Sequence, residues 1–161
     1  LLLEVTEAVC AAVGAGRVGV RLSPSKHFND MHDSTPFETF GVAVAGIDAL
    51  GLAYLHLSGA APGSPELEPG TEGLAQALRQ RFRGPLILNG GYDRERTEQA
   101  LRQGAADAIS FANDYIANPD LVRRLREGAP LAQADRSRLY GGGAQGYTDY
   151  PALDEAQSRK A

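Results

Sequence analysis

The chain alternates short apolar runs with longer segments in which apolar residues recur at every third or fourth position. The short runs are typical of β-strands, which we expect at residues 17–22, 52–57, 85–89 and 106–111. The longer segments predict amphipathic helices at residues 1–13, 35–50, 71–82, 93–103 and 118–127. Strands that alternate with helices pair in parallel, because each helix carries the chain back to the same end of the sheet. The pattern therefore predicts an α/β protein.

The first helix has an apolar stripe and a clear end, but no signal for its start. Leu2, Val5, Val9 and Val13 recur at helical spacing, and Gly14 is expected to terminate the helix. No Ser, Thr, Asp or Asn precedes the helix to cap its amino end. We therefore expect this chain to be a piece of a longer protein.

The first predicted strand favours a barrel over an open, doubly wound sheet. Val18, Val20 and Leu22 share one face of this strand, and Arg21 lies on the other face near its carboxyl end. In an open sheet that face lies beneath a helix, where an unpaired guanidinium is costly. In a (β/α)8 barrel the carboxyl ends of the strands form the ligand-binding mouth, where a charge is expected. Four strand–helix units make half of such a barrel.

Glycine-bearing loops follow the third and fourth predicted strands. Gly90 and Gly91 come directly after the third strand, and residues 110–114 follow the fourth. Glycine lets backbone N–H groups approach an anion closely. Taken alone, Gly90-Gly91 reads as a tight turn before a helix capped by Asp93, and Arg21 as half of an ion pair. The combination favours a site for a phosphate-bearing ligand.

Composition narrows the class of protein. The 161 residues are 43% apolar with a net charge of −4, which predicts one soluble domain over residues 1–161 and no nucleic-acid partner. No apolar stretch approaches the ~20 residues of a membrane span.

The cysteine and the histidines give no sign of a metal site. The lone Cys10 indicates a reducing compartment, so a cytoplasmic location is expected. His27, His32 and His56 lack metal-ligand spacing, so no metal site is expected; His56, on an apolar strand, is expected to be a hydrogen-bonded core histidine.

Several motifs resemble, in order, the second half of the Old Yellow Enzyme family. They are GVRLSP at 19–24, FNDM at 28–31, LAYLH at 52–56, NGGY at 89–92, YIANPDLV at 115–122 and YGGGAQGYTDYP at 140–151. Members of this family are (β/α)8 barrels that bind FMN at the barrel mouth. They reduce the flavin with NAD(P)H and then reduce the activated C=C bond of a small-molecule alkene. The resemblance thus implies an ene-reductase, present here as the carboxyl-terminal half of a TIM barrel (units 5–8 and the tail).

The resemblance also implies roles for single residues. Arg21 is similar to the strand arginine that contacts the N1/C2 carbonyl edge of the flavin. Gly90 and Gly91 resemble the loop whose amides bind the FMN phosphate. Asn29 resembles a residue that lines the substrate pocket, and Tyr147 an aromatic residue that closes over the substrate.

One position departs from the family pattern. Ala112-Asn113 stands where the family usually has Gly-Arg, and that arginine clamps the phosphate. Asparagine can donate a hydrogen bond but carries no charge. We therefore expect the phosphate contact of Ala112 and Asn113 to be weaker by roughly 1 kcal/mol or more.

The resemblance implies that the catalytic groups lie elsewhere. The family's proton-donating Tyr, its His/Asn or His/His pair and its flavin-contacting Thr and Gln belong to the first four barrel units. We accordingly assign no catalytic residue here and expect the isolated chain to be inactive. The open strand edges of a half barrel predict self-association or pairing with the missing amino-terminal half.

Two other interpretations stay open at this stage. The chain could be a non-catalytic fragment or half-barrel that binds a phosphate-bearing ligand and needs a partner chain. A different barrel enzyme with a phosphorylated substrate would need a catalytic Lys or carboxylate at a strand end. Lys26 and Asp30 lie in the loop after the first strand, but nothing in the sequence pairs them.

Overall fold

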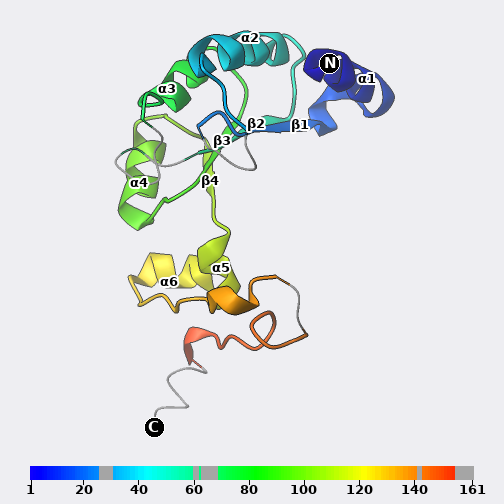
Figure 1. Ribbon diagram of the computed structural model, residues 1–161. Coiled ribbons are helices and arrows are strands. Elements are labelled where there is room, and N and C mark those ends of the chain that lie inside the picture. Colours follow the sequence, from blue (N-terminus) through cyan, green and yellow to red (C-terminus); the bar gives the residue numbers. More distant parts are fainter. Residues whose placement is uncertain (26–30, 60–61, 63–68, 141–142, 155–161) are drawn as a thin grey trace. The chain divides into compact units, whose positions relative to one another are not determined.

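The computed structural model describes residues 1–25, 31–59, 62, 69–140 and 143–154 (Figure 1). The chain divides into two compact units, Leu1–Ser110 and Phe111–Ala161, and each is described by itself. Whether residues 1–161 behave as one domain stays a prediction.

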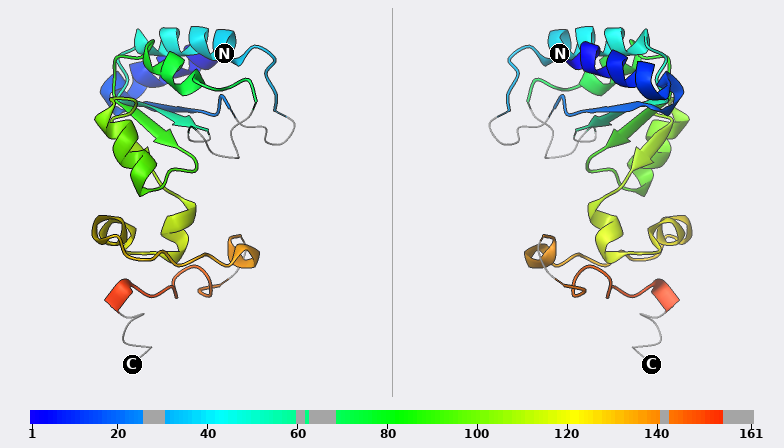
Figure 2. Two further views of the ribbon diagram at one scale, coloured as in Figure 1. Left: turned by 90° about the vertical axis from the view of Figure 1, so that its left-hand side faces the viewer. Right: turned by 90° about the vertical axis from the view of Figure 1, so that its right-hand side faces the viewer.

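The first unit is a parallel four-stranded sheet whose strands follow one another in chain order. The strands are β1 (Gly19–Leu22), β2 (Tyr54–Ser58), β3 (Leu86–Asn89) and β4 (Ala108–Ser110), and the helices that alternate with them are α1 (Leu2–Val13), α2 (Pro36–Asp48), α3 (Leu74–Arg79) and α4 (Arg94–Arg102). Figures 1 and 2 show these helices on one side of the sheet. A doubly wound sheet reverses its strand order and carries helices on both faces. The α/β prediction and the preference for a barrel are therefore confirmed.

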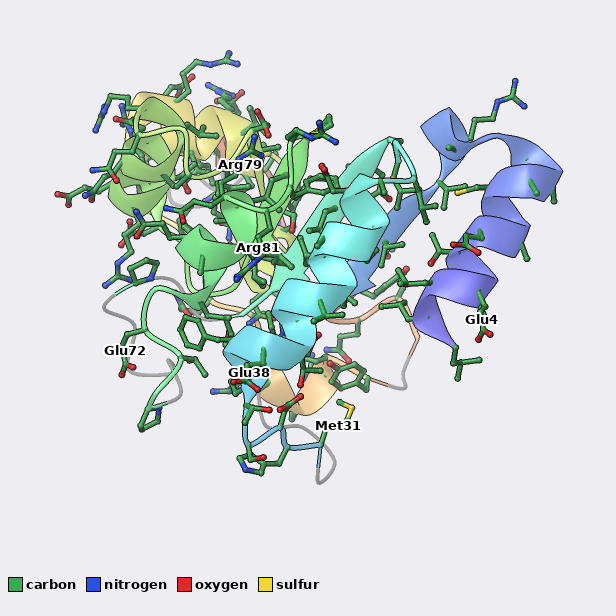
Figure 3. The ribbon with its side chains drawn as sticks, turned by 90° about the horizontal axis from the view of Figure 1, so that it is seen from above. Glu4, Met31, Glu38, Glu72, Arg79 and Arg81 are labelled. Atoms are coloured by element: carbon green, nitrogen blue, oxygen red, sulfur yellow. The ribbon has the colours of Figure 1, made fainter. Side chains whose placement is uncertain are left out.

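The apolar core of the first unit lies between the sheet and its helices. Leu55 and Leu57 of β2 and Leu86 and Leu88 of β3 are buried. They pack on the side of α2 and α3, whose buried apolar residues are Val44, Ile47, Leu74 and Leu78. Charged side chains such as Glu4 and Glu38 project from the outer surface of α1 and α2 (Figure 3).

The first helix forms and ends as predicted, but the side of the helix that is buried is not its apolar stripe. Gly14 terminates α1 with φ 90° and donates its N–H to the Cys10 carbonyl at 2.8 Å. The buried residue of α1 is Thr6, whose hydroxyl donates to the Leu2 carbonyl at 2.8 Å. The predicted stripe is 38–52% exposed; its members are Leu2, Val5, Val9 and Val13. This apolar stripe is therefore only partly covered in the described part of the chain.

The second unit has short helices, and only α6 among them was predicted. They are α5 (Asn113–Ala117), α6 (Leu121–Glu127) and the 3-10 turn η2 (Arg136–Arg138). Gly128 ends α6 as expected, with φ 67°. Asn118, whose residue type favours the cap of a helix that begins at residue 118, does not cap α6. Its side chain is fully buried, where it donates to the Asp114 carbonyl at 2.7 Å and accepts from the Ala132 amide at 2.8 Å.

A buried ion pair holds the tail of the second unit on α6. Arg124 is 4% exposed and donates to Asp120 at 2.7 Å, to the Pro130 carbonyl at 2.9 Å and to the Pro151 carbonyl at 3.1 Å. Asp120 also accepts the Leu153 amide at 2.9 Å. Burial alone would raise the pKa of Asp120, but the hydrogen bonds from Arg124 and Leu153 lower it overall. The tail is thus fixed by polar groups as well as by apolar packing.

Candidate functional site

The sheet of the first unit has a second face, which its helices do not cover. Because side chains alternate along a strand, this face carries the residues between the core leucines. They are Gly19, Arg21, Tyr54, His56, Ser58, Ile87, Asn89, Ala108 and Ser110. Ser58, Asn89 and Ser110 are in register across three strands, and Arg21 is in register with His56. The polar members therefore gather at the carboxyl ends of the strands.

Arg21 is the charged group of this cluster, and it reaches across two neighbouring strands. Its Nη2 donates to Ser58 Oγ at 3.0 Å and to Asn89 Oδ1 at 3.3 Å. The Ser58 hydroxyl in turn donates to Asn89 Oδ1 at 3.4 Å. Within the described residues Arg21 makes no ion pair, and its side chain is exposed. Its positive charge is therefore not neutralised by a neighbouring carboxylate in this part of the chain.

His56 lies in the same cluster, on β2 in register with Arg21 of β1. Its Nε2 is 3.1 Å from Ser110 Oγ, and the ring is half-buried. Burial, and then the positive charge of Arg21, lower the pKa of His56. The predicted hydrogen bond is confirmed. The expected core position is wrong, because alternation along β2 places His56 on the uncovered face with Ser58.

The glycine loop begins where the cluster ends. Gly90 and Gly91 have φ 120° and 66°, a region that strongly favours glycine, and they directly follow Asn89. Their amide N–H groups donate no hydrogen bond within the described residues. Asp93 accepts the Arg96 amide at 2.8 Å and so caps α4 as predicted. Within the described residues, amides without an acceptor thus lie one and two residues beyond the asparagine that Arg21 contacts.

The remaining predicted residues lie outside the first unit or outside the described residues. Ala112 and Asn113 are exposed at the start of α5, and Tyr147 is 80% exposed, all in the second unit. Asn29 belongs to the residues that the structure does not describe. Ser58 and Asn89 also belong to the site, although neither is among the residues predicted from the sequence. Their signal is alternation with leucines: Ser58 follows Leu55 and Leu57, and Asn89 follows Leu86 and Leu88.

The chemistry of this cluster is that of an anion-binding cradle. Within the described residues, Arg21 Nε and Nη1 and the amides of Gly90 and Gly91 donate no hydrogen bond, and such donors can hold a negatively polarised ring edge or a phosphate. No group of three or more His, Cys, Asp or Glu residues that could hold a metal ion is found among the residues described. The searched residues also contain no helix suited to crossing a membrane.

A strand order without reversal and helices on one face of the sheet define half of a TIM barrel, and a polar cluster lies at the carboxyl ends of its strands. The chain belongs to the NADH:flavin oxidoreductase / NADH oxidase family, whose family model matches residues 1–132. This match confirms the resemblance to the Old Yellow Enzyme family, and the members of the matched family are oxidoreductases.

Plant relatives and solved structures agree with this assignment. The chain is 39% identical to a putative 12-oxophytodienoate reductase 10 and 40% identical to 12-oxophytodienoate reductase 1, both from Oryza sativa subsp. japonica. These matches cover 98% and 95% of this chain, but 52% and 41% of the relatives. The structure is similar to the Old Yellow Enzyme homologue from Zymomonas mobilis, with a TM-score of 0.88, 39% identity and coverage of 94% of this chain and 43% of the other. Morphinone reductase gives a TM-score of 0.84 at 42% identity, over 96% of this chain and 41% of its own.

The chain thus spans about half the length, or less, of the curated relatives that it matches. Coverage of about 40% of the TIM-barrel structures corresponds to the four strand–helix units of the sheet. The prediction of half a (β/α)8 barrel is therefore confirmed.

Proposed function

We propose that this chain is the FMN-cradling, carboxyl-terminal half of an NAD(P)H-dependent ene-reductase. The observation that supports this most directly is Arg21: an exposed guanidinium at the strand ends, hydrogen-bonded to Ser58 and Asn89 and without a carboxylate partner among the described residues. The family match and the relatives named as 12-oxophytodienoate reductases support a flavin-dependent reduction.

The residues present fit FMN. When bound, FMN supplies the hydride chemistry that links NAD(P)H to an activated alkene. Arg21 offers N–H donors and a positive charge to the N1/C2 carbonyl edge, where negative charge accumulates on reduction. The amides of Gly90 and Gly91 are available to the phosphate. The family resemblance, and not the structure, assigns Ala112 and Asn113 to the same phosphate, Asn113 as a neutral donor. Among the described residues no acidic side chain bonds to Arg21, which would face the flavin edge.

The substrate contacts are proposed from the family resemblance alone. Asn29 and Tyr147 are assigned to the alkene pocket on the family resemblance, and the exposed ring of Tyr147 is accessible for such a contact. No proton donor for the alkene is assigned to this chain. Turnover therefore requires a second half that supplies the acid and the groups that bind the substrate's carbonyl or nitro oxygen.

The surface for such a second half is present in the first unit. Among the described residues β1 pairs with β2 alone and β4 with β3 alone, so both outer strand edges are unpaired. The exposed apolar stripe of α1 lies on the element that precedes β1. The missing share of the relatives' length matches an amino-terminal half barrel in size. We assign this partner to the β1 edge and the α1 stripe.

Complementation tests the proposal. The chain is mixed with the amino-terminal half of the Zymomonas mobilis homologue, and FMN binding is measured by flavin fluorescence and visible absorbance. We expect FMN binding that Arg21→Ala weakens roughly a hundredfold, because charge-assisted hydrogen bonds are lost. Arg21→Lys should weaken it less, since the charge is kept. The matched control is Arg83→Ala, which removes an exposed ion pair with Asp48.

Reduction of 2-cyclohexenone by NADPH separates the remaining possibilities. We expect turnover from the complemented protein and none from the isolated chain. A complemented protein that stays colourless with excess FMN would overturn the proposal. If that protein nevertheless bound inorganic phosphate, the non-catalytic half-barrel interpretation would replace it.

A further inference from the structure

We propose that Ser58 and Asn89 are positioning residues for Arg21. They hold its Nη2, so that the donors on Nε and Nη1 are directed to the negatively polarised edge of the flavin. This inference rests on the proposed function, and it assigns a role to two residues that carry none so far.

The hydrogen bonds around Nη2 form a closed triangle. Arg21 Nη2, Ser58 Oγ and Asn89 Oδ1 are separated by 3.0, 3.3 and 3.4 Å. The two N–H groups of Nη2 thus have one acceptor each. A guanidinium is planar and rigid, so holding one terminal nitrogen while β1 holds the stem restricts the orientation of the whole group.

The orientation of the Asn89 amide is fixed independently of Arg21. Its Nδ2 donates to the Ser110 backbone carbonyl at 2.9 Å. A carbonyl oxygen can only accept, so the NH₂ end must face Ser110 and Oδ1 must face Arg21. The strand register supports this arrangement, because Asn89 lies between Ser58 and Ser110 in adjacent strands. The clamp is therefore anchored in the sheet backbone.

The two partners of Arg21 are neutral, and this matters for the chemistry. A carboxylate at position 58 or 89 would also hold the guanidinium, but it would offset the positive charge. A hydroxyl and an amide oxygen orient Arg21 while leaving its charge available for a reduced, anionic flavin. Among the described residues no acidic side chain bonds to Arg21, Ser58 or Asn89. The cluster thus combines fixed geometry with a full positive charge.

The first test measures the order of the Arg21 side chain in the flavin-free chain. In ¹⁵N relaxation spectra of the Nε–H group we expect Asn89→Ala and Ser58→Ala each to increase guanidinium motion. The matched control is Arg79→Ala, which should leave the motion of Arg21 unchanged. Arg79 (labelled in Figure 3) donates to Asp107 and to the Gly84 carbonyl, which precede β4 and β3 at the amino ends of the strands. Unchanged Arg21 motion in both cluster variants would overturn the inference, whatever the chain binds.

The second test is a double-mutant cycle on FMN affinity in the complemented protein. We expect about a tenfold loss for Asn89→Ala and about a hundredfold loss for Arg21→Ala. The double variant should bind no more weakly than Arg21→Ala, because Asn89 acts through Arg21. Effects that multiply would assign Asn89 an independent role and overturn the inference.

A conservative variant adds a readout that a structural role alone would not move. Asn89→Asp keeps the side-chain size and the acceptor for Arg21, but it loses the donor to the Ser110 carbonyl and places a negative charge beside Arg21. We expect the midpoint potential of the bound flavin to become more negative, and an unchanged potential contradicts the inference. If Arg21→Ala weakens FMN binding and Asn89→Ala does not, this inference alone is overturned. If the complemented protein binds no FMN at all, the proposed function is overturned with it.

Discussion

The two faces of the sheet in the first unit belong to the same strands but carry different chemistry. On the covered face, Leu55 and Leu86 are fully buried beneath helices. On the uncovered face, Arg21 and Asn89 form a polar cluster at the strand ends. The first face supplies apolar burial, which dominates the stability of a domain, and the second supplies directed donors and charge. Stability and ligand binding should therefore respond to different substitutions in neighbouring residues.

The largest effect is expected from the covered face of β2. Leu55→Ala removes a fully buried side chain and should lower the free energy of unfolding by about 2–5 kcal/mol. Ser58→Ala, three residues along the same strand and on the other face, should cost about 1 kcal/mol. Urea unfolding followed by circular dichroism measures both. Equal losses for the two variants would contradict the division between the faces.

The next effect concerns the apolar stripe of α1, which is only partly covered in the described chain. Val5→Glu and Val9→Glu should each weaken association with an amino-terminal half barrel by about tenfold or more, because an apolar contact is replaced by a charge. The stability of the chain alone should change by less than about 0.5 kcal/mol, since both residues are already exposed. Analytical ultracentrifugation of the mixture gives the association constant.

The control for this experiment lies on the same helix. Ala11→Glu adds the same charge to an exposed position of α1 outside the stripe. It should leave association unchanged. Equal weakening by Ala11→Glu would show that net charge, not the stripe, governs assembly.

A smaller change is expected from completing the phosphate site. Asn113→Arg should raise FMN affinity of the complemented protein by about tenfold, because a neutral donor is replaced by a charged, bidentate one. Asn113→Gln is the matched control, with a longer side chain and no charge. Titration calorimetry measures both, and no gain for Asn113→Arg would contradict the assignment of Asn113 to the phosphate.

Much of the fold could be predicted because local patterns and tertiary packing agree. Gly14 and Gly128 end helices in left-handed or extended positive-φ geometry, and Asp93 caps α4, as their residue types favour. The leucines of β2 and β3 mark the covered face through simple alternation. Arg21 indicated the barrel because a charge on a strand is costly beneath a helix.

Other features depend on contacts that a linear pattern does not contain. The stripe of α1 is apolar, yet Thr6 is the buried residue, so an apolar face does not by itself say which neighbour it meets. Asn118 has the residue type of a helix cap, but the partners that bury it, Asp114 and Ala132, lie on either side of α6 in sequence. The role of Ser58 and Asn89 depended on strand register, which alternation alone does not fix.

The smallest effect is a pH dependence that arises on the uncovered face. Burial, and then the charge of Arg21, lower the pKa of His56, while in the unfolded chain its pKa is about 6.5. The unfolded chain therefore binds a proton more readily than the folded one. The contribution of His56 to stability is undiminished above about pH 6.5 and decreases as the pH falls from there through its folded-state pKa.

Two variants test this pH dependence. His56→Gln should make the free energy of unfolding less sensitive to acid over this interval. Arg21→Ala should raise the pKa of His56, as measured by NMR titration. Removal of His32, which is exposed and lies outside the sheet, is the control. A His56 pKa at or above the ordinary value would contradict its position beside Arg21, which has no carboxylate partner among the described residues. It would also contradict the contrast between the two faces of the sheet.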